Sequence, residues 1–270
     1  MRRDYKKIRS AAVLLSCALL LFIFTFTDLD ISRALYGNMP RFARFFEIYG
    51  YLPSCLLACG MSAIGFCTNK SVVKKLHRVL GYVLFPLCSI AGCSFGLLVI
   101  YRKVWEISPN PWALLACAAL LTVVLFFLVG RIPSECLDSY RKGAIAALFA
   151  LILLLLSVEV LKNIFGRVRF REMTEPFSEF TRWYIVNGPT SHKSFPSGHT
   201  ANAAAVLCLT LTAQKKRTRQ ILWAFGFLYM LVMAFSRIIA GAHFASDVLA
   251  GGLIGIGCVL LSRKLFHLPA

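Results

Sequence analysis

Long apolar runs, nearly free of charge, alternate along the chain with short polar segments rich in basic residues. Five runs have about the length that a helix needs to cross roughly 30 Å of hydrocarbon: Ala11–Thr27, Tyr51–Cys67, Val79–Tyr101, Trp112–Val129 and Gly143–Leu161. Three later runs are shorter and reach that length only with flanking polar residues: Thr200–Ala213, Ile221–Phe235 and Val248–Leu261. Because the runs lack the alternation of barrel strands, they predict an all-α polytopic membrane bundle of about eight transmembrane helices.

The basic residues between the runs predict an orientation. With eight spans and a cytoplasmic N-terminus, 18 of the 30 Lys and Arg residues lie in the cytoplasmic segments, which are residues 1–10, 68–78, 130–142, 214–220 and 262–270. This distribution agrees with the positive-inside rule. A six-span arrangement, in which two of the first five runs are interfacial or re-entrant, is the alternative.

The composition favours one integral membrane domain over residues 1–270, with N-terminal helices in 1–142 and a core in 143–270. The chain is 58% hydrophobic, whereas ordinary globular domains are about half apolar. The net charge of +18 does not predict a nucleic-acid partner, because no basic stripe with interleaved aromatic residues lies in a soluble domain. The ten cysteines show no metal-site or disulfide spacing and are interpreted as small apolar residues.

The longest polar stretch is Lys162–His199. Within it four aromatic residues recur at roughly helical spacing: Phe177, Phe180, Trp183 and Tyr184. This spacing predicts an interfacial helix whose aromatic side chains lie at the level of the lipid headgroups.

Ionisable residues at membrane depth are costly and indicate functional sites. Three such clusters occur in the C-terminal half: Lys162–Arg171, Pro196–His199 and Ser236–Asp247. The predicted topology places all three at the extracytoplasmic end of the C-terminal helices. We therefore expect them to converge on one face of the bundle.

Several cations, two histidines and one carboxylate together favour a phosphate site, because Arg and Lys neutralise phosphate oxygens. One imidazole can attack phosphorus, and the other can protonate the leaving oxygen. On a helix, His243 and Asp247 would share a face, since they are four residues apart. A metal site built from His199, His243 and Asp247 is disfavoured, because the neighbouring Lys and Arg residues would repel a cation.

The clusters resemble the type 2 phosphatidic acid phosphatase family, which are membrane-bound lipid phosphatases related to vanadium haloperoxidases. The family pattern is Lys, six residues, Arg-Pro; then Pro-Ser-Gly-His; then Ser-Arg, five residues, His, three residues and Asp. The matching residues are Lys162 with Arg169, Pro196 to His199, and Ser236-Arg237 with His243 and Asp247. Phe170 stands where the family usually has Pro, a change that removes no charged group.

The resemblance implies a role for each matching residue. His243 would be the nucleophile, Asp247 its partner and His199 the general acid. The phosphate would be bound by Lys162, Arg169, Ser197, Gly198 and Arg237. No metal and no other cofactor is expected. Among the nearby residues, Arg167 and Arg171 are interpreted as headgroup or rim contacts, and Glu159 as the partner of Lys162 or another local cation.

The resemblance also implies a substrate class: a lipid phosphomonoester or pyrophosphate, such as phosphatidic acid, phosphatidylglycerophosphate, undecaprenyl pyrophosphate, a lipid A phosphate or a sphingoid phosphate. A lipid-to-lipid phosphotransferase using the same site is the alternative. A transporter or lipid-binding protein that binds the anion without catalysis is a further alternative. The expected location is a bacterial cytoplasmic membrane, with the endoplasmic reticulum as the other option. The partners are the bilayer and the lipid substrate, and the oligomeric state stays open.

Overall fold

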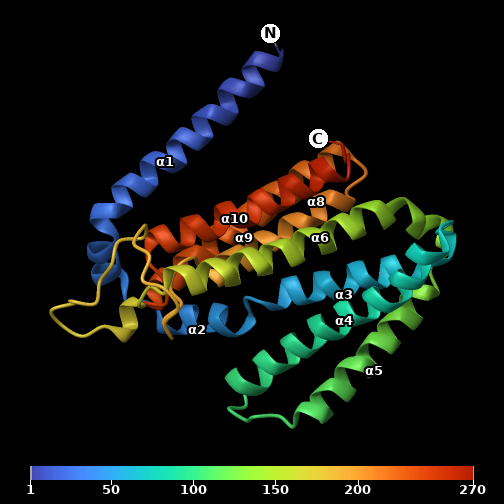
Figure 1. Ribbon diagram of the computed structural model, residues 1–270, viewed down its shortest axis with the longest axis horizontal. Coiled ribbons are helices and arrows are strands. Elements are labelled where there is room, and N and C mark those ends of the chain that lie inside the picture. Colours follow the sequence, from blue (N-terminus) through green and yellow to red (C-terminus); the bar gives the residue numbers. More distant parts are fainter. Residues whose placement is uncertain (1, 270) are drawn as a thin grey trace.

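The computed structural model describes residues 2–269 and the side chains of residues 11–269. The regular elements of these residues are all helical (Figure 1), which confirms the all-α class. In chain order they are α1 (Arg2–Leu35), α2 (Pro40–Tyr49), α3 (Leu52–Cys67), η1 (Asn69–Ser71), α4 (Lys75–Lys103), α5 (Pro111–Gly130), α6 (Ser134–Phe165), η2 (Phe170–Glu172), α7 (Gly198–Ala204), η3 (Ala205–Cys208), α8 (Leu209–Thr212), α9 (Lys216–Ile239) and α10 (Ala245–Leu265).

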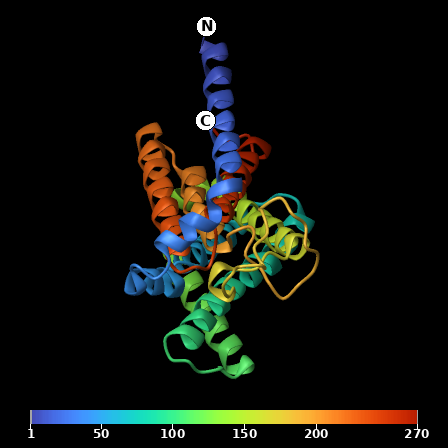
Figure 2. The same ribbon diagram turned by 90° about the vertical axis from the view of Figure 1, so that its left-hand side faces the viewer.

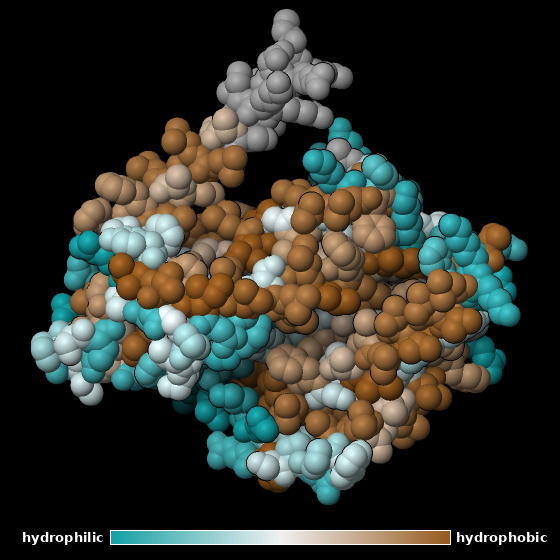
Figure 3. Space-filling view, viewed as in Figure 1, coloured by the Kyte–Doolittle hydropathy of each residue, from teal (hydrophilic) through white to brown (hydrophobic). Residues whose placement is uncertain are grey.

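Within residues 2–269, seven helical stretches are long and apolar enough to cross a membrane. They are α1, α4, α5, α6, α9, α10 and the pair α2–α3, which together form the stretch Pro40–Cys67. Apolar surface covers the middle of the helices and polar surface gathers toward their ends (Figure 3). The chain is therefore a multi-pass helical membrane protein, as the apolar runs predict.

The sixth predicted span differs from the others. Residues Gly198–Thr212 form the short elements α7, η3 and α8 in direct succession, 15 residues in all. At about 1.5 Å per residue this segment is roughly 22 Å long, short of the roughly 30 Å of hydrocarbon. It runs alongside α9 and α10 inside the bundle (Figure 1), so it need not match the thickness of the lipid.

Small side chains allow the neighbouring helices to enclose this segment. Ala201 and Ala204 are completely buried. Gly255 of α10 and Gly226 of α9 pack against the segment from two sides, and a Cβ atom on Gly255 would lie 2.5 Å from the Cβ of Ala204. Such contacts let α6, α9 and α10 pack closely around this segment, and they place the start of α7 beside the start of α10.

The polar stretch after α6 forms a long loop over one end of the bundle (Figures 1 and 2). Gly166 ends α6 in the left-handed conformation, with φ of +49°, which glycine adopts at little cost. The predicted interfacial helix is wrong, because η2 is the only helical turn in residues 166–197. The aromatic residues instead anchor the loop: Trp183 donates from Nε1 to Thr25 of α1 at 3.0 Å, and Phe180 packs edge-on against Phe244.

Candidate active site

The three polar clusters meet at the end of the bundle that the long loop covers (Figure 2). Two contacts of backbone groups join residues 194–197, which lead into the second cluster, to the third cluster. Ser197 N–H donates to the carbonyl of Asp247 at 2.9 Å, and the carbonyl of Ser194 lies 2.6 Å from Nδ1 of His243. The first cluster reaches the same place, because Lys162 Nζ would lie 2.9 Å from a Cβ atom on Gly198. Residues far apart in sequence therefore share one site.

His243 lies in the turn before α10, and only 3% of its surface is exposed. The carbonyl of Ser194 can only accept a hydrogen bond, so the proton of the neutral ring is on Nδ1 and the lone pair is on Nε2. Asp247 Oδ2 is 3.8 Å from Nδ1. The predicted pairing of His243 with Asp247 is therefore present as a contact. It is not set on a helix, because α10 begins at Ala245, and the carbonyl of Ser194 takes the Nδ1 hydrogen bond.

Burial lowers the pKa of His243 to about 4. The carboxylate of Asp247 opposes this shift, and the positive charges of Lys162 and Arg169 add to it. His243 is therefore uncharged at neutral pH, and its Nε2 lone pair is free to attack an electrophile.

Asp247 is completely buried, and three donors surround its carboxylate. Oδ2 accepts from the Ser194 hydroxyl at 2.6 Å and from the backbone N–H of Phe244 at 2.9 Å. Oδ1 accepts from Arg167 Nη1 at 2.6 Å. The carboxylate thus caps the N-terminus of α10 and fixes the loop residue whose carbonyl orients His243.

Arg167 is 1% exposed, so the expectation that it contacts lipid headgroups is wrong. Its guanidinium bridges two carboxylates, with Nη1 on Asp247 and Nη2 3.0 Å from Asp28 of α1. Nε donates to the carbonyl of Thr181 at 2.8 Å, and the guanidinium lies 4.1 Å from the centre of the Phe244 ring. These partners satisfy a charge that would otherwise be very costly to bury.

His199 is the second residue of α7, and its ring packs against Tyr51 with the ring centres 4.2 Å apart. The Tyr51 hydroxyl is 3.3 Å from Nδ1, while the buried Nε2 has no hydrogen-bond partner among the described residues. Burial, followed by the positive charge of Arg237 and the nearby imidazole of His243, lowers the pKa of His199 well below its usual value. Ser197 caps the helix by accepting from the N–H of Thr200 at 3.3 Å.

The predicted phosphate-binding cations retain unused donors. Arg237 is fully buried. Its Nη2 donates to the carbonyl of Ala43 and its Nε to Ser236, but Nη1 has no hydrogen-bond partner within the part of the chain that the structure describes. Arg169 pairs through Nη1 with Glu172 at 3.1 Å, while its buried Nε also lacks a hydrogen-bond partner in these described residues. The site therefore holds buried N–H groups that a bound anion could satisfy.

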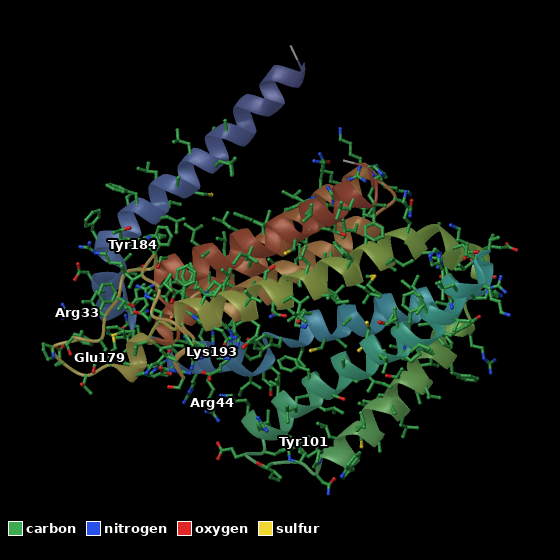
Figure 4. All side chains as sticks on the ribbon, in the orientation of Figure 1. Arg33, Arg44, Tyr101, Glu179, Tyr184 and Lys193 are labelled. Atoms are coloured by element: carbon green, nitrogen blue, oxygen red, sulfur yellow. The ribbon has the colours of Figure 1, made fainter. Side chains whose placement is uncertain are left out.

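Ion pairs between the loop and the helices surround this centre. Lys193 Nζ binds Glu159 at 2.6 Å, as expected for a cation near Glu159, and Figure 4 shows Lys193 at this end of the bundle. His192 lies 3.1 Å from Glu172. Partial burial acts to raise the pKa of Glu172, but the hydrogen bond from His192 and the charge of Arg169 lower it below its usual value. Arg171 lies at the rim as predicted, 3.5 Å from Glu47.

Phe170, which replaces the usual proline of the family pattern, is 6% exposed. Its ring stacks on Phe177 at 5.3 Å and meets Tyr36 and Phe244 edge-on. The aromatic side chain therefore extends the apolar layer on which the Arg167 guanidinium lies.

Fold and site together define a helical multi-pass membrane protein with a buried, cationic, two-histidine centre at one end of its bundle. Residues 143–268 match the model of the PAP2 superfamily. The match confirms the resemblance that the three motifs indicate.

Two curated proteins are similar to the chain. An undecaprenyl-diphosphatase of Sulfolobus acidocaldarius is 27% identical over 126 residues, which are 46% of this chain and 56% of that protein. A lipid A 4'-phosphatase of Bacteroides thetaiotaomicron is 31% identical over 99 residues, 35% of this chain and 40% of that protein. The chain thus spans about half the length of the curated relatives it matches. No solved structure matches the chain.

Asp28 and Tyr51 contact the site but lie outside both the motifs and the matched region. Asp28 carries a detectable signal, because a carboxylate directly after a 17-residue apolar run is a candidate for burial. The sequence around Tyr51 gives no such signal, since an aromatic residue at the start of an apolar run usually marks the membrane interface.

Proposed function

We propose that this protein is a membrane lipid phosphatase that hydrolyses a lipid phosphomonoester or pyrophosphate through a phosphohistidine on His243. The observation that carries the proposal is the set of buried, unpartnered N–H donors on Arg169 and Arg237, in one site with an unprotonated histidine nitrogen. A phosphate group fits both features. Its anionic oxygens accept several hydrogen bonds, and its phosphorus is an electrophile that accepts a nitrogen nucleophile.

In the first step, the Nε2 lone pair of His243 would form a bond to phosphorus while the bond from phosphorus to the leaving oxygen breaks. The negative charge of the bound phosphate would favour protonation of His199, which would then give its Nε2 proton to that oxygen. Water would then form a bond to phosphorus and lose a proton to His199, while the bond from phosphorus to Nε2 of His243 breaks and inorganic phosphate is released. Lys162, Arg169, Arg237, Ser197 and the Gly198 amide would hold the phosphate oxygens throughout, and no step requires a metal.

The lipid class follows from the position of the site at the end of an apolar bundle. Relatives named as an undecaprenyl-diphosphatase and a lipid A 4'-phosphatase support a lipid phosphate or pyrophosphate as substrate. The positive-inside rule supports an extracytoplasmic site, because 18 of the 30 Lys and Arg residues fall in the segments assigned to the cytoplasm. Residues 143–270 would form the catalytic core, and residues 1–142 the supporting helices.

Phosphate release by the detergent-purified protein tests the proposal. The substrates would be phosphatidic acid, phosphatidylglycerophosphate, undecaprenyl pyrophosphate and a lipid A phosphate, each with excess EDTA. We expect EDTA-resistant release that is lost in His243→Ala and retained in His192→Ala, which alters a half-exposed rim histidine. Equal activity of His243→Ala and the wild type would refute the phosphohistidine. Phosphate transfer only when a second lipid is present would favour the phosphotransferase.

A further inference from the structure

Tyr51 lies at the break between α2 and α3 and belongs to none of the motifs. Gly50 and Tyr51 interrupt the helical stretch, Pro53 lies in the first turn of α3, and the Ser54 hydroxyl donates to the carbonyl of Tyr51 at 2.8 Å. Phe95 of α4 packs edge-on against the Tyr51 ring, with centres 5.3 Å apart. The break therefore holds this side chain in a defined place against His199.

The two ring nitrogens of His199 have different surroundings. Nδ1 is 3.3 Å from the Tyr51 hydroxyl, whereas Nε2 is buried and has no hydrogen-bond partner among the side chains of residues 11–269 or the backbone of 2–269. The same hydroxyl lies 3.5 Å from where a Cβ atom on Gly198 would be, which places it at the predicted phosphate-binding backbone. A tyrosine oxygen can accept a hydrogen bond from Nδ1–H in both the charged and the neutral imidazole.

From these contacts we infer that Tyr51 is a positioning residue for the general acid, an inference that rests on the proposed function. The hydroxyl oxygen accepts from Nδ1–H, which keeps one proton on Nδ1 throughout the cycle. Nε2 is then the nitrogen that gives its proton to the leaving oxygen and takes one from water in the second step. The N-terminal helices would thus supply a component of the acid–base machinery.

Tyr51→Phe tests this role, because it removes the hydroxyl and keeps the ring that packs on Phe95 and His199. The two substrates would be a long-chain alkyl phosphate and a nitrophenyl phosphate carrying the same alkyl chain. An alkoxide needs a proton in order to leave, whereas a nitrophenolate does not. The quantity measured is kcat/KM, which reports the steps up to cleavage of the bond to the leaving oxygen.

We expect Tyr51→Phe to lower kcat/KM at least about 10-fold on the alkyl phosphate and less than about 3-fold on the nitrophenyl phosphate. His199→Ala should show the same selectivity with a larger loss. Tyr49→Phe, two residues away on an exposed ring, is the matched control and should behave as the wild type.

Equal losses on the two substrates would show a purely structural role and overturn the inference, as would no loss on either. Failure of the proposed function looks different: the wild type and His243→Ala would then release phosphate equally, or not at all, from both substrates. That result would remove the basis of the Tyr51 role as well.

Discussion

The charged groups of Asp28 and Arg167 are in contact at 3.0 Å inside the protein, although the two residues are 139 positions apart in the sequence. Arg167 also binds Asp247 at 2.6 Å, so one cation holds two buried carboxylates. Asp28 additionally accepts hydrogen bonds from the backbone and the hydroxyl of Ser246, the residue before Asp247. The first helix is thereby tied to the turn that carries His243.

Replacement of Asp28 by Asn should weaken catalysis without weakening phosphate binding. The substitution keeps the side-chain shape but leaves Arg167 with one carboxylate, so Asp247 and the His243 turn are held less firmly. We expect kcat to fall roughly 10-fold, since small misplacements of a nucleophile are costly, with KM nearly unchanged. Steady-state phosphate release measures both constants.

The matched control for Asp28→Asn is Asp30→Asn, which alters an exposed carboxylate on the same helix. It should leave kcat unchanged. A rise in KM at constant kcat in Asp28→Asn would show that Asp28 acts on the phosphate cations instead, which contradicts the geometry described here.

The Asp28–Arg167 pair also illustrates what the sequence could and could not reveal. The motif residues were predictable because ionisable residues beside apolar runs are rare and because their spacings resemble a known family pattern. The environment of Arg167 was not, since its interpretation as a rim residue depended on membrane depth alone. Its burial depends on a carboxylate from a different helix, and no local pattern encodes that partner.

The same limit applies to the helices. Apolar runs long enough to cross hydrocarbon were found correctly, because lipid imposes a length and a composition on them. The segment Gly198–Thr212 escapes this rule, since protein surrounds it. The interfacial helix failed for a related reason: the aromatic residues of the loop pack on α1 and on Phe244, and these tertiary contacts override their helical spacing.

The ionisation of His243 can be measured directly. Its pKa of about 4 predicts that the ring stays neutral from pH 5 to 8, with the proton on Nδ1. Nitrogen-15 histidine NMR in detergent, with His243→Gln to assign the signal, should show an Nε2 resonance that titrates near pH 4. A midpoint near 6.5, the ordinary value for histidine, would show that the resting site is more polar than its burial indicates.

The sign of this shift also predicts a pH effect on stability. The unfolded chain takes up a proton on His243 near pH 6.5, whereas the folded protein does so only near pH 4. Stability should therefore fall as the pH drops from about 6.5 toward 4. His243→Gln removes this contribution, so its thermal unfolding midpoint should decline less over that interval than that of the wild type.

Gly198 should be intolerant of a side chain, because a Cβ atom there would lie 2.9 Å from Lys162 Nζ. The lysine ammonium is the end of a flexible side chain and can move, so the fold should survive while the phosphate site is distorted. We expect Gly198→Ala to raise the inhibition constant of inorganic phosphate at least about 10-fold, the effect of losing one charge-assisted contact.

Gly60→Ala is the control for this substitution, because no atom lies within 4 Å of its Cβ position in the interior of α3. It should leave phosphate inhibition unchanged and stabilise the helix slightly, since alanine is the better helix former. Equal phosphate affinity in Gly198→Ala and Gly60→Ala would show that Lys162 does not belong to the phosphate site.

Restoring the family proline at position 170 should harm this protein. Phe170→Pro would remove a ring that contacts Tyr36, Phe177 and Phe244 beneath the Arg167 network. Loss of a buried phenylalanine costs about 3 kcal/mol or more, whereas Phe170→Leu, which keeps much of the apolar volume, should cost about 1 kcal/mol. Thermal inactivation in detergent should therefore be fastest for Phe170→Pro, intermediate for Phe170→Leu and slowest for the wild type.

At low temperature both variants should keep kcat, because Arg169 remains beside the site. A Phe170→Pro variant as stable as the wild type would mean that backbone stiffness after Arg169, and not the aromatic packing, determines the order of this loop.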